Sequence, residues 1–288
     1  MAARFDRDYG RLDRPEILRI VFHPRPEWGP PASPHAHLVR IPVGTNPTGA
    51  SHTDADQAQK AAECAEIAGR FHAPHPAGPN ILFFHGNGET VGDYDDVAAR
   101  FAAVGANLLA VGYRGYGDST GTPTNAAMLA DCHEALAFTR QWLAHAGHTG
   151  PLVAMGRSLG SVSALELAAA HPGALAGLIL ESALAYSLPL LKLFGMSPAR
   201  LGLTEADGYG NVEKIATWQR PLLLLHGEDD DLLPVDNARI LFDACPAARK
   251  TLCVVRHAGH NDIFLRGERR YMDAVASLLA TLDLKPPA

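Results

Sequence analysis

The stretch that decides the fold is LVAMGRSLGSVSALELAAA, residues 152–170. Its beginning, Leu152–Met155, is a short apolar run typical of a buried strand, and its end, Ser161–Ala170, favours a helix. Between them Gly156-Arg157-Ser158-Leu159-Gly160 matches G-x-S-x-G. In this context the motif predicts a tight strand-to-helix turn that strains the backbone of Ser158 and pushes its hydroxyl into solvent.

A serine at such a turn is a candidate nucleophile. The motif alone is short enough to occur by chance, and an ordinary glycine-rich turn is the alternative. A serine hydroxyl is also a weak nucleophile at neutral pH, so catalysis requires a base within hydrogen-bond reach and a carboxylate behind that base. Both must come from elsewhere in the chain.

Short apolar runs alternate with longer amphipathic runs from about Asn80 onward, a pattern typical of an α/β fold with a mostly parallel central sheet flanked by helices. We expect strands buried on both faces at Ile81–Phe84, Leu108–Tyr113, Leu152–Met155, Leu178–Leu180, Leu222–Leu225 and Thr251–Val255. Apolar residues at helical spacing predict helices over 129–143 and 271–282.

The first part of the chain is predicted less directly. Ile17–Phe22 and Leu38–Val43 look like two strands that form an antiparallel edge, and Ala55–Glu66 is helix-permissive. With no internal repeat and no linker, we expect one domain over residues 1–288, with edge strands and loops over 1–79 and a short cap-like insertion over 183–218.

Two polar clusters follow the last two predicted strands. His226–Asp231 comes after Leu222–Leu225, and His257–Asp262 comes after Thr251–Val255. Parallel strands bring their carboxyl ends to one edge of the sheet, where Ser158 also lies, so these distant residues are expected to converge there. Serine, acid and histidine then follow one another in the chain order that this type of fold uses.

These clusters, with Phe84-His85-Gly86-Asn87-Gly88 and the stretch Tyr113–Ser119 (YRGYGDS), resemble the α/β-hydrolase superfamily over roughly residues 81–282. The chain is most similar to small serine hydrolases with an H-G-N oxyanion motif, a Y-R-G-Y-G turn and a G-H-N-D histidine loop, a group that includes esterases and depalmitoylating thioesterases. The resemblance implies a serine hydrolase with an α/β-hydrolase fold and a short cap.

The resemblance also implies which residues act. The family's acid begins a D-x-x-V-P type turn, and only Asp230 has proline in the fifth position, so Asp229 and Asp231 are interpreted as solvated loop charges. The histidine that follows a glycine, His260, is the implied base, with His257 as a bystander.

Two backbone N–H groups are needed for an oxyanion hole. Leu159 supplies one because it follows the nucleophile, and the resemblance assigns the other to Asn87. Because both act through the backbone, changes of either side chain are expected to be tolerated.

The expected reaction is hydrolysis of carboxylic esters of small or medium acyl groups through an acyl-enzyme. Apolar residues of the insertion, among them Tyr186 and Met196, together with Leu232, are weaker candidates for a substrate pocket, and an amphipathic helix packed on the sheet explains the insertion equally well. A thioesterase acting on acyl-CoA or acylated protein is one alternative, and a catalytically silent ligand- or partner-binding member of the fold is another.

Composition excludes several other classes. A net charge of -6 offers no general attraction to nucleic acid, so nucleic acid is not an expected partner. The sequence has no long apolar run, so we expect no membrane insertion. It also has no apolar secretory signal, and its four cysteines are scattered, so we expect a cytoplasmic protein. The H-x-x-H spacings lack the helical pattern of a metal site, and the expected mechanism needs no cofactor. The oligomeric state is not predicted.

Overall fold

The computed structural model describes residues 7–27, 29, 35–44 and 64–282. These residues form an eight-stranded sheet in the order β1-β2-β4-β3-β5-β6-β7-β8, in which β1 and β2 run antiparallel to their neighbours and all other pairs are parallel. The strands are β1 Ala36–Val43, β2 Ala65–His72, β3 Asn80–Phe84, β4 Asn107–Val111, β5 Leu152–Arg157, β6 Gly177–Glu181, β7 Leu222–Gly227 and β8 Lys250–Val255. The predicted parallel strands agree with these bounds to within two residues at each end.

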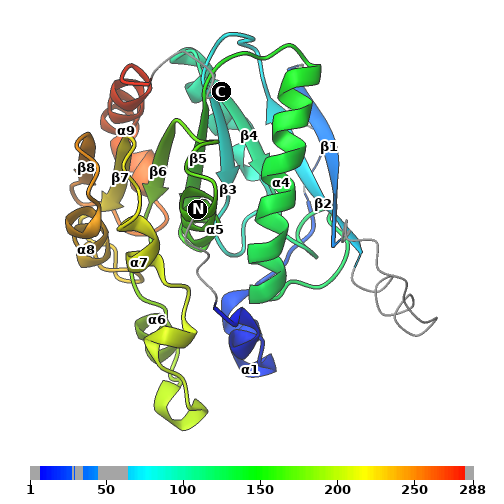
Figure 1. The fold of residues 1–288 in the computed structure, drawn as a ribbon. Coiled ribbons are helices and arrows are strands. Elements are labelled where there is room, and N and C mark those ends of the chain that lie inside the picture. Colours follow the sequence, from blue (N-terminus) through cyan, green and yellow to red (C-terminus); the bar gives the residue numbers. More distant parts are fainter. Residues whose placement is uncertain (1–6, 28, 30–34, 45–63, 283–288) are drawn as a thin grey trace.

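Helices cover both faces of the sheet, and Figure 1 shows α4 in front of it. The helices are α1 Pro15–Val21, α3 Asp95–Ala103, α4 Asn125–His145, α5 Gly160–Ala170, α6 Leu188–Leu193, α7 Asn211–Ile215, α8 Asp236–Ala244 and α9 Ile263–Leu279. Apolar residues of α4, α5, α7 and α8 share one core with one face of the sheet. Those of α3 and α9 share a second core with the opposite face.

The central strands are buried along their whole length, as expected for a parallel sheet covered on both sides. Each fully buried Leu or Phe contributes about 1.5–3 kcal/mol of transfer free energy, so their register is strongly determined. β8 corrects the expectation, because Lys250, Thr251 and Leu252 are partly or fully exposed. It is an edge strand with a single neighbour, β7.

The prediction for Ile17–Phe22 is wrong, because this segment is helix α1 rather than an edge strand. Pro15 occupies the first turn and Glu16 lies beside the positive end of the helix dipole. Ile17 and Val21, one helical turn apart, are both buried. Burial of this stripe outweighs the β preference of Ile and Val.

The antiparallel edge consists of β1, as predicted from Leu38–Val43, and of β2, which was missed. Most of the helix-permissive stretch Ala55–Glu66 lies outside the described residues, but Ala65 and Glu66 begin β2 and therefore correct that prediction.

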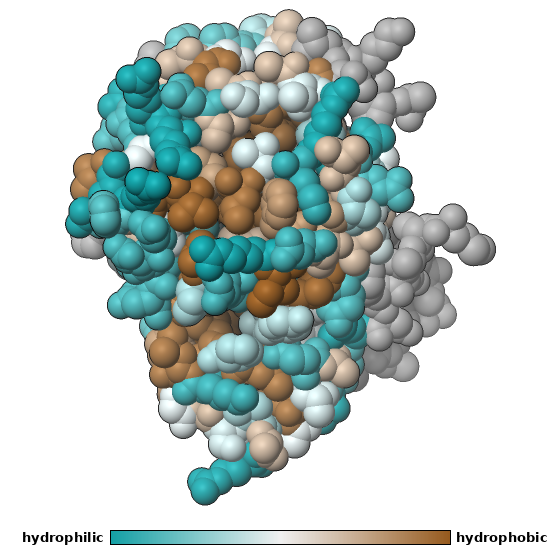
Figure 2. Space-filling model, turned by 90° about the vertical axis from the view of Figure 1, so that its left-hand side faces the viewer, coloured by the Kyte–Doolittle hydropathy of each residue, from teal (hydrophilic) through white to brown (hydrophobic). Residues whose placement is uncertain are grey.

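The side of the molecule with α8 and α9 mixes apolar and hydrophilic side chains. Figure 2 shows several apolar patches there, framed by hydrophilic residues. Ile240 of α8 is 37% exposed and Leu265 of α9 is 84% exposed. No described helix is both long and apolar enough to cross a bilayer.

Candidate active site

The turn between β5 and α5 has the geometry that its motif predicts. Ser158 has a φ of 50°, a left-handed conformation that is strained for a residue with a side chain. A Cβ on Gly156 would lie 2.2 Å from the carbonyl oxygen of Gly160, and one on Gly160 would lie 2.0 Å from that of Phe84. Both glycines are therefore required for the turn to close.

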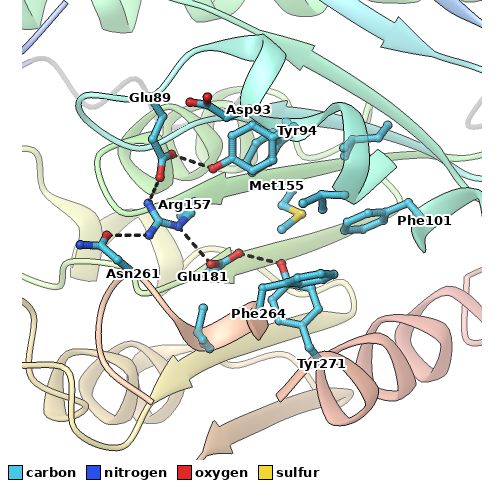
Figure 3. A pocket seen from close by; sticks show the side chains of 14 residues that line it. Glu89, Asp93, Tyr94, Phe101, Met155, Arg157, Glu181, Asn261, Phe264 and Tyr271 are labelled. Atoms are coloured by element: carbon cyan, nitrogen blue, oxygen red, sulfur yellow. Dashed lines mark hydrogen bonds and ion pairs between the residues drawn. The ribbon is translucent and has the colours of Figure 1, made fainter. Parts of the chain in front are cut away.

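The hydroxyl of Ser158 is not pushed into solvent as expected. The residue is only 8% exposed, because the imidazole of His260 lies directly against it. The backbone N–H of Ser158 donates to the carbonyl of Glu181 at 2.9 Å, which ties the turn to the end of β6. The neighbouring Arg157 side chain enters a separate cavity (Figure 3).

The structure brings Ser158, His260 and Asp230 together. Nε2 of His260 lies 2.9 Å from Oγ of Ser158, and Nδ1 lies 2.8 Å from Oδ2 of Asp230. Both distances are within hydrogen-bond range. His257 lies apart, with its side chain 82% exposed and its Nδ1 3.8 Å from Asp229.

Asp230 is buried and well supported. Its Oδ1 accepts the backbone N–H groups of Leu232 at 3.1 Å and Leu233 at 2.8 Å. Burial alone would raise the pKa of this carboxyl, but hydrogen bonds from His226, His260 and the N–H of Leu233 hold that pKa well below its usual range. Asp230 is therefore ionised at neutral pH and can hold the Nδ1 proton of His260.

The other two acids of the loop differ from Asp230. Asp229 and Asp231 are both exposed, and in the described part of the chain neither one contacts His260 or Ser158.

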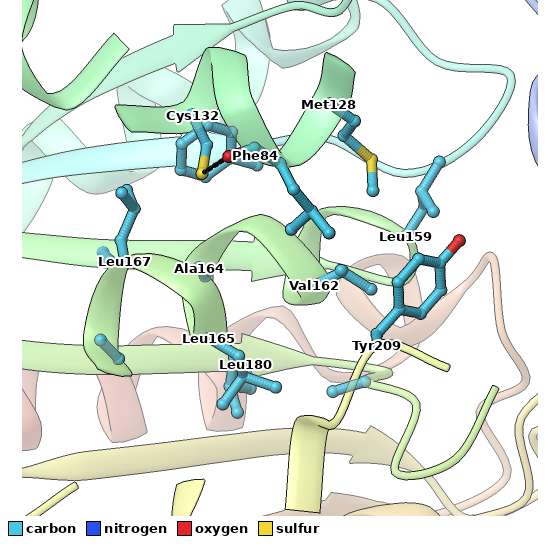
Figure 4. Close-up of a cluster of buried hydrophobic side chains, with 14 of the residues drawn as sticks. Phe84, Met128, Cys132, Leu159, Val162, Ala164, Leu165, Leu167, Leu180 and Tyr209 are labelled. Atoms are coloured by element: carbon cyan, nitrogen blue, oxygen red, sulfur yellow. Dashed lines mark hydrogen bonds between the residues drawn. The ribbon is translucent and has the colours of Figure 1, made fainter. Parts of the chain in front are cut away.

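The two residues expected to form the oxyanion hole lie on adjacent loops. Among the hydrogen bonds between described residues, none has the backbone N–H of Asn87 or Leu159 as its donor. The side chain of Leu159 is buried in the core beside α5, where Figure 4 shows it with Val162 and Tyr209. That side chain packs and does not face solvent.

Side-chain hydrogen bonds anchor the loop that carries Asn87. Its Oδ1 accepts the hydroxyl of Tyr116 at 2.7 Å and the backbone N–H of His23 at 2.8 Å, and its Nδ2 contacts Nδ1 of His23 at 2.7 Å. Tyr113 donates to the carbonyl of His85 at 2.6 Å. The two tyrosines of the Y-R-G-Y-G turn thus support the loop after β3, so the expected tolerance of changes at Asn87 does not fit this structure.

His85 is fully buried, and its Nδ1 lies 2.8 Å from the carbonyl oxygen of Gly86. Burial lowers the pKa of this imidazole, which is therefore neutral at physiological pH. Its Nε2 has no hydrogen-bond partner among the described residues. His85 thus braces its own loop.

Comparisons with known proteins identify the family. The family model Hydrolase_4, for serine aminopeptidase, S33, matches residues 75–201. Protein bem46 of Schizosaccharomyces pombe is 30% identical over 73% of this chain and 70% of its own length. Human alpha/beta hydrolase domain-containing protein 17B is 29% identical over 65% of this chain and 62% of its own length. This chain belongs to the α/β-hydrolase superfamily.

Solved structures show the same fold. The esterase Pf2001 of Pyrococcus furiosus superposes with a TM-score of 0.67 at 16% identity, over 90% of this α/β-hydrolase and 98% of the esterase chain. A monoacylglycerol lipase from Paleococcus ferrophilus gives a TM-score of 0.57 at 18% identity, over 74% of this chain and 98% of its own. These neighbours show the fold, and the hydrolase family supports hydrolase activity.

The segment of this α/β-hydrolase that was expected to form a cap, residues 183–218, has two sides. Leu188 and Leu191 of α6 are buried against the core, whereas Leu193 and Phe194 are 54% and 48% exposed. Of the weaker substrate candidates, Tyr186 is 40% exposed before α6, and Met196 and Leu232 pack partly against the core. Their contact with substrate stays a prediction.

Among the residues of this α/β-hydrolase that the structure describes, no group of three or more His, Cys, Asp or Glu side chains is arranged to hold a metal ion.

Proposed function

We propose that this chain is a serine esterase that hydrolyses carboxylic esters of small or medium acyl groups. The observation that carries the proposal is the continuous hydrogen-bond chain from Ser158 through His260 to Asp230, with distances of 2.9 and 2.8 Å. A neutral imidazole in this place takes the serine proton as the hydroxyl attacks, and the carboxylate stabilises the imidazolium that results.

The reaction has two halves. Ser158 attacks the ester carbonyl, and His260 transfers the proton to the leaving alcohol, which leaves an acyl-enzyme. Water then attacks the acyl-enzyme with the same histidine as base, and the carboxylic acid is released. In both halves the N–H groups of Asn87 and Leu159 stabilise the developing oxyanion.

The preference for small or medium acyl groups rests on the cap. Its helices α6 and α7 have only six and five residues, so the cap provides little cover for a long acyl chain. A thioester would be attacked by the same serine, so matched oxygen and sulfur esters of acetate, butyrate and octanoate measure the leaving-group and acyl preferences together.

The experiment is hydrolysis of p-nitrophenyl acetate and butyrate by the parental protein and Ser158→Ala. The variant should lose activity completely, and a fluorophosphonate should add to Ser158 in the parental protein only, as seen by intact mass and peptide mapping. Ser163→Ala is a matched control, because Oγ of Ser163 is buried without a hydrogen-bond partner in the described chain. Near-parental turnover by Ser158→Ala, or an adduct on another serine, would contradict the proposal.

A further inference from the structure

Arg157, next to the proposed nucleophile, is a buried cation that the reaction itself does not use. Its side chain is only 9% exposed. Arg157 follows Met155 on one face of β5, so the guanidinium lies on the α3 and α9 side of the sheet. Figure 3 shows it between Glu89 and Glu181, with Asn261 beside it. A buried charge is retained only where it is paired and hydrogen-bonded.

One end of the guanidinium holds the histidine loop. Nη2 of Arg157 donates to the backbone carbonyl of His260 at 2.9 Å and to Oδ1 of Asn261 at 3.0 Å. These contacts restrain the backbone of the proposed base without touching its imidazole, which stays available to Ser158.

The other end reaches the oxyanion loop. Nη1 of Arg157 pairs with Oε1 of Glu89, whose Oε2 accepts the backbone N–H of Gly86 at 2.6 Å and the hydroxyl of Tyr94 at 2.6 Å. Gly86 directly precedes Asn87, and a Cβ on Gly86 would lie 2.6 Å from Nη1 of Arg157. A side chain at Gly86 would therefore collide with the guanidinium, and the loop is linked to Arg157 through Glu89.

A third contact reaches the backbone of the nucleophile. Nε of Arg157 donates to Oε1 of Glu181 at 3.1 Å, and Tyr271 donates to Oε2 of the same carboxyl at 2.6 Å. The carbonyl of Glu181 accepts the N–H of Ser158. Arg157 thus links the three segments that must be placed correctly relative to one another.

We propose that Arg157 is a positioning residue that fixes the oxyanion loop and the His260 loop around Ser158. The inference rests on the proposed function, and it deepens it by naming what holds the two loops together. A shift of about 1 Å in such groups is enough to reduce a rate about 10²-fold, because transition-state hydrogen bonds depend steeply on geometry. The hydrogen bonds of Arg157 to described residues go to Glu181, Glu89, Asn261 and the carbonyl of His260, and none goes to the hydroxyl of Ser158.

The charge on Arg157 is permanent over the working pH range. Burial alone disfavours it, but Tyr94, Glu89 and Glu181 around it raise the pKa of the guanidinium above its already high value. The guanidinium therefore stays charged and can hold both loops over the working pH range.

A cavity of about 250 Å³ adjoins the guanidinium (Figure 3). Apolar side chains, including Phe101, Met155 and Phe264, form one part of its wall, and the charged network forms the other. Truncation of Arg157 would extend this cavity to the two loops. A free guanidinium ion could then enter and restore part of the lost hydrogen bonds.

The test compares Arg157→Ala and Arg157→Lys with Lys214→Met, which removes another fully buried cation, paired with Glu166 at 2.6 Å on the α5 and α7 side. Activity on p-nitrophenyl butyrate is measured well below the unfolding temperature of every variant. We expect kcat to fall about 10²–10³-fold in Arg157→Ala, comparable to the loss of an oxyanion donor. KM should change less than threefold, and kcat of Lys214→Met should stay within threefold of parental.

Two further measurements separate positioning from a general loss of structure. Guanidinium chloride at about 50 mM, far below denaturing concentrations, should raise kcat of Arg157→Ala about tenfold, whereas sodium chloride at the same concentration should not. Arg157→Lys, which keeps one charge but lacks the planar fork, should fold and lose at least tenfold in kcat.

The inference is overturned if a folded Arg157→Ala or Arg157→Lys keeps kcat within threefold of parental. It is also overturned if the loss of kcat/KM comes from a higher KM, or if guanidinium does not raise kcat of Arg157→Ala. If Arg157→Ala does not fold, Arg157→Lys decides. A parental protein without esterase activity, or an active Ser158→Ala, would instead refute the proposed function. The two failures are therefore distinguishable.

Discussion

Replacement of Asp230 by Asn should disable the proposed base, because it moves the ring proton of His260 from Nδ1 to Nε2. Oδ1 of Asp230 accepts two backbone N–H groups, from Leu232 and Leu233, so in Asp230→Asn the amide oxygen must stay at that position. The amide NH₂ then faces Nδ1 of His260, 2.8 Å away, and must donate to it. Nδ1 becomes an acceptor, Nε2 carries the proton, and Nε2 can no longer accept the proton of Ser158.

The expected cost is large. A triad histidine held in the wrong tautomer typically loses about 10⁴ in kcat, which corresponds to about 5.4 kcal/mol of transition-state stabilisation. The assay is kcat and kcat/KM on p-nitrophenyl acetate from pH 6 to 9, with circular dichroism as a check of folding. Asp229→Asn and Asp231→Asn are matched controls on exposed neighbours and should stay within threefold of parental. A folded Asp230→Asn within tenfold of parental activity would refute the tautomer argument.

Two more predictions concern the oxyanion loop and acid stability. Tyr116→Phe removes the hydroxyl that donates to Asn87, and should lower kcat roughly tenfold with little change in KM, so a larger change in KM than in kcat would count against the role. Glu166, despite its burial, has its pKa lowered to about 2 by His133 and Lys214, so its contribution to stability, up to roughly 3 kcal/mol, is present above pH 4.5 and lost as pH falls toward 2. The stability difference between the parental protein and Glu166→Gln in urea should therefore shrink between pH 6 and 3, and a constant difference would contradict this assignment.

The place of the candidate site was predictable because two simple regularities determine it. Parallel strands end at one edge, and polar residues directly after those ends must lie there, which places Ser158 and the clusters that contain Asp230 and His260 together. The choice of Asp230 and His260 within their clusters came from the family resemblance. The need for Gly156 was equally predictable, since a Cβ there would meet the backbone of Gly160 in the same turn, whereas one on Gly160 would meet Phe84 of the neighbouring strand. The chemistry of these residues could therefore be inferred from the sequence.

Other features depended on contacts that no local pattern reveals. Residues 17–22 have strand-like composition, but their burial on one side of a helix decides their structure. The G-x-S-x-G motif assigns no role to Arg157, its second residue. The partners of Arg157, Glu89, Glu181 and Asn261, are scattered over the chain, so no local pattern connects them. An arginine directly before the nucleophile was the one signal in the sequence, and only the packed structure shows that it is buried and which residues it pairs with.

The contact between His23 and Asn87 has a consequence for protein engineering. The segment after α1 and the loop after β3 form one mechanical unit, because backbone and side chain of His23 hold the amide of Asn87. The segment that matches the family model, 75–201, includes the loop but not its tether. A chimera with a relative must therefore exchange both pieces together, since a graft of either piece alone would leave a loop whose anchoring surface belongs to another protein.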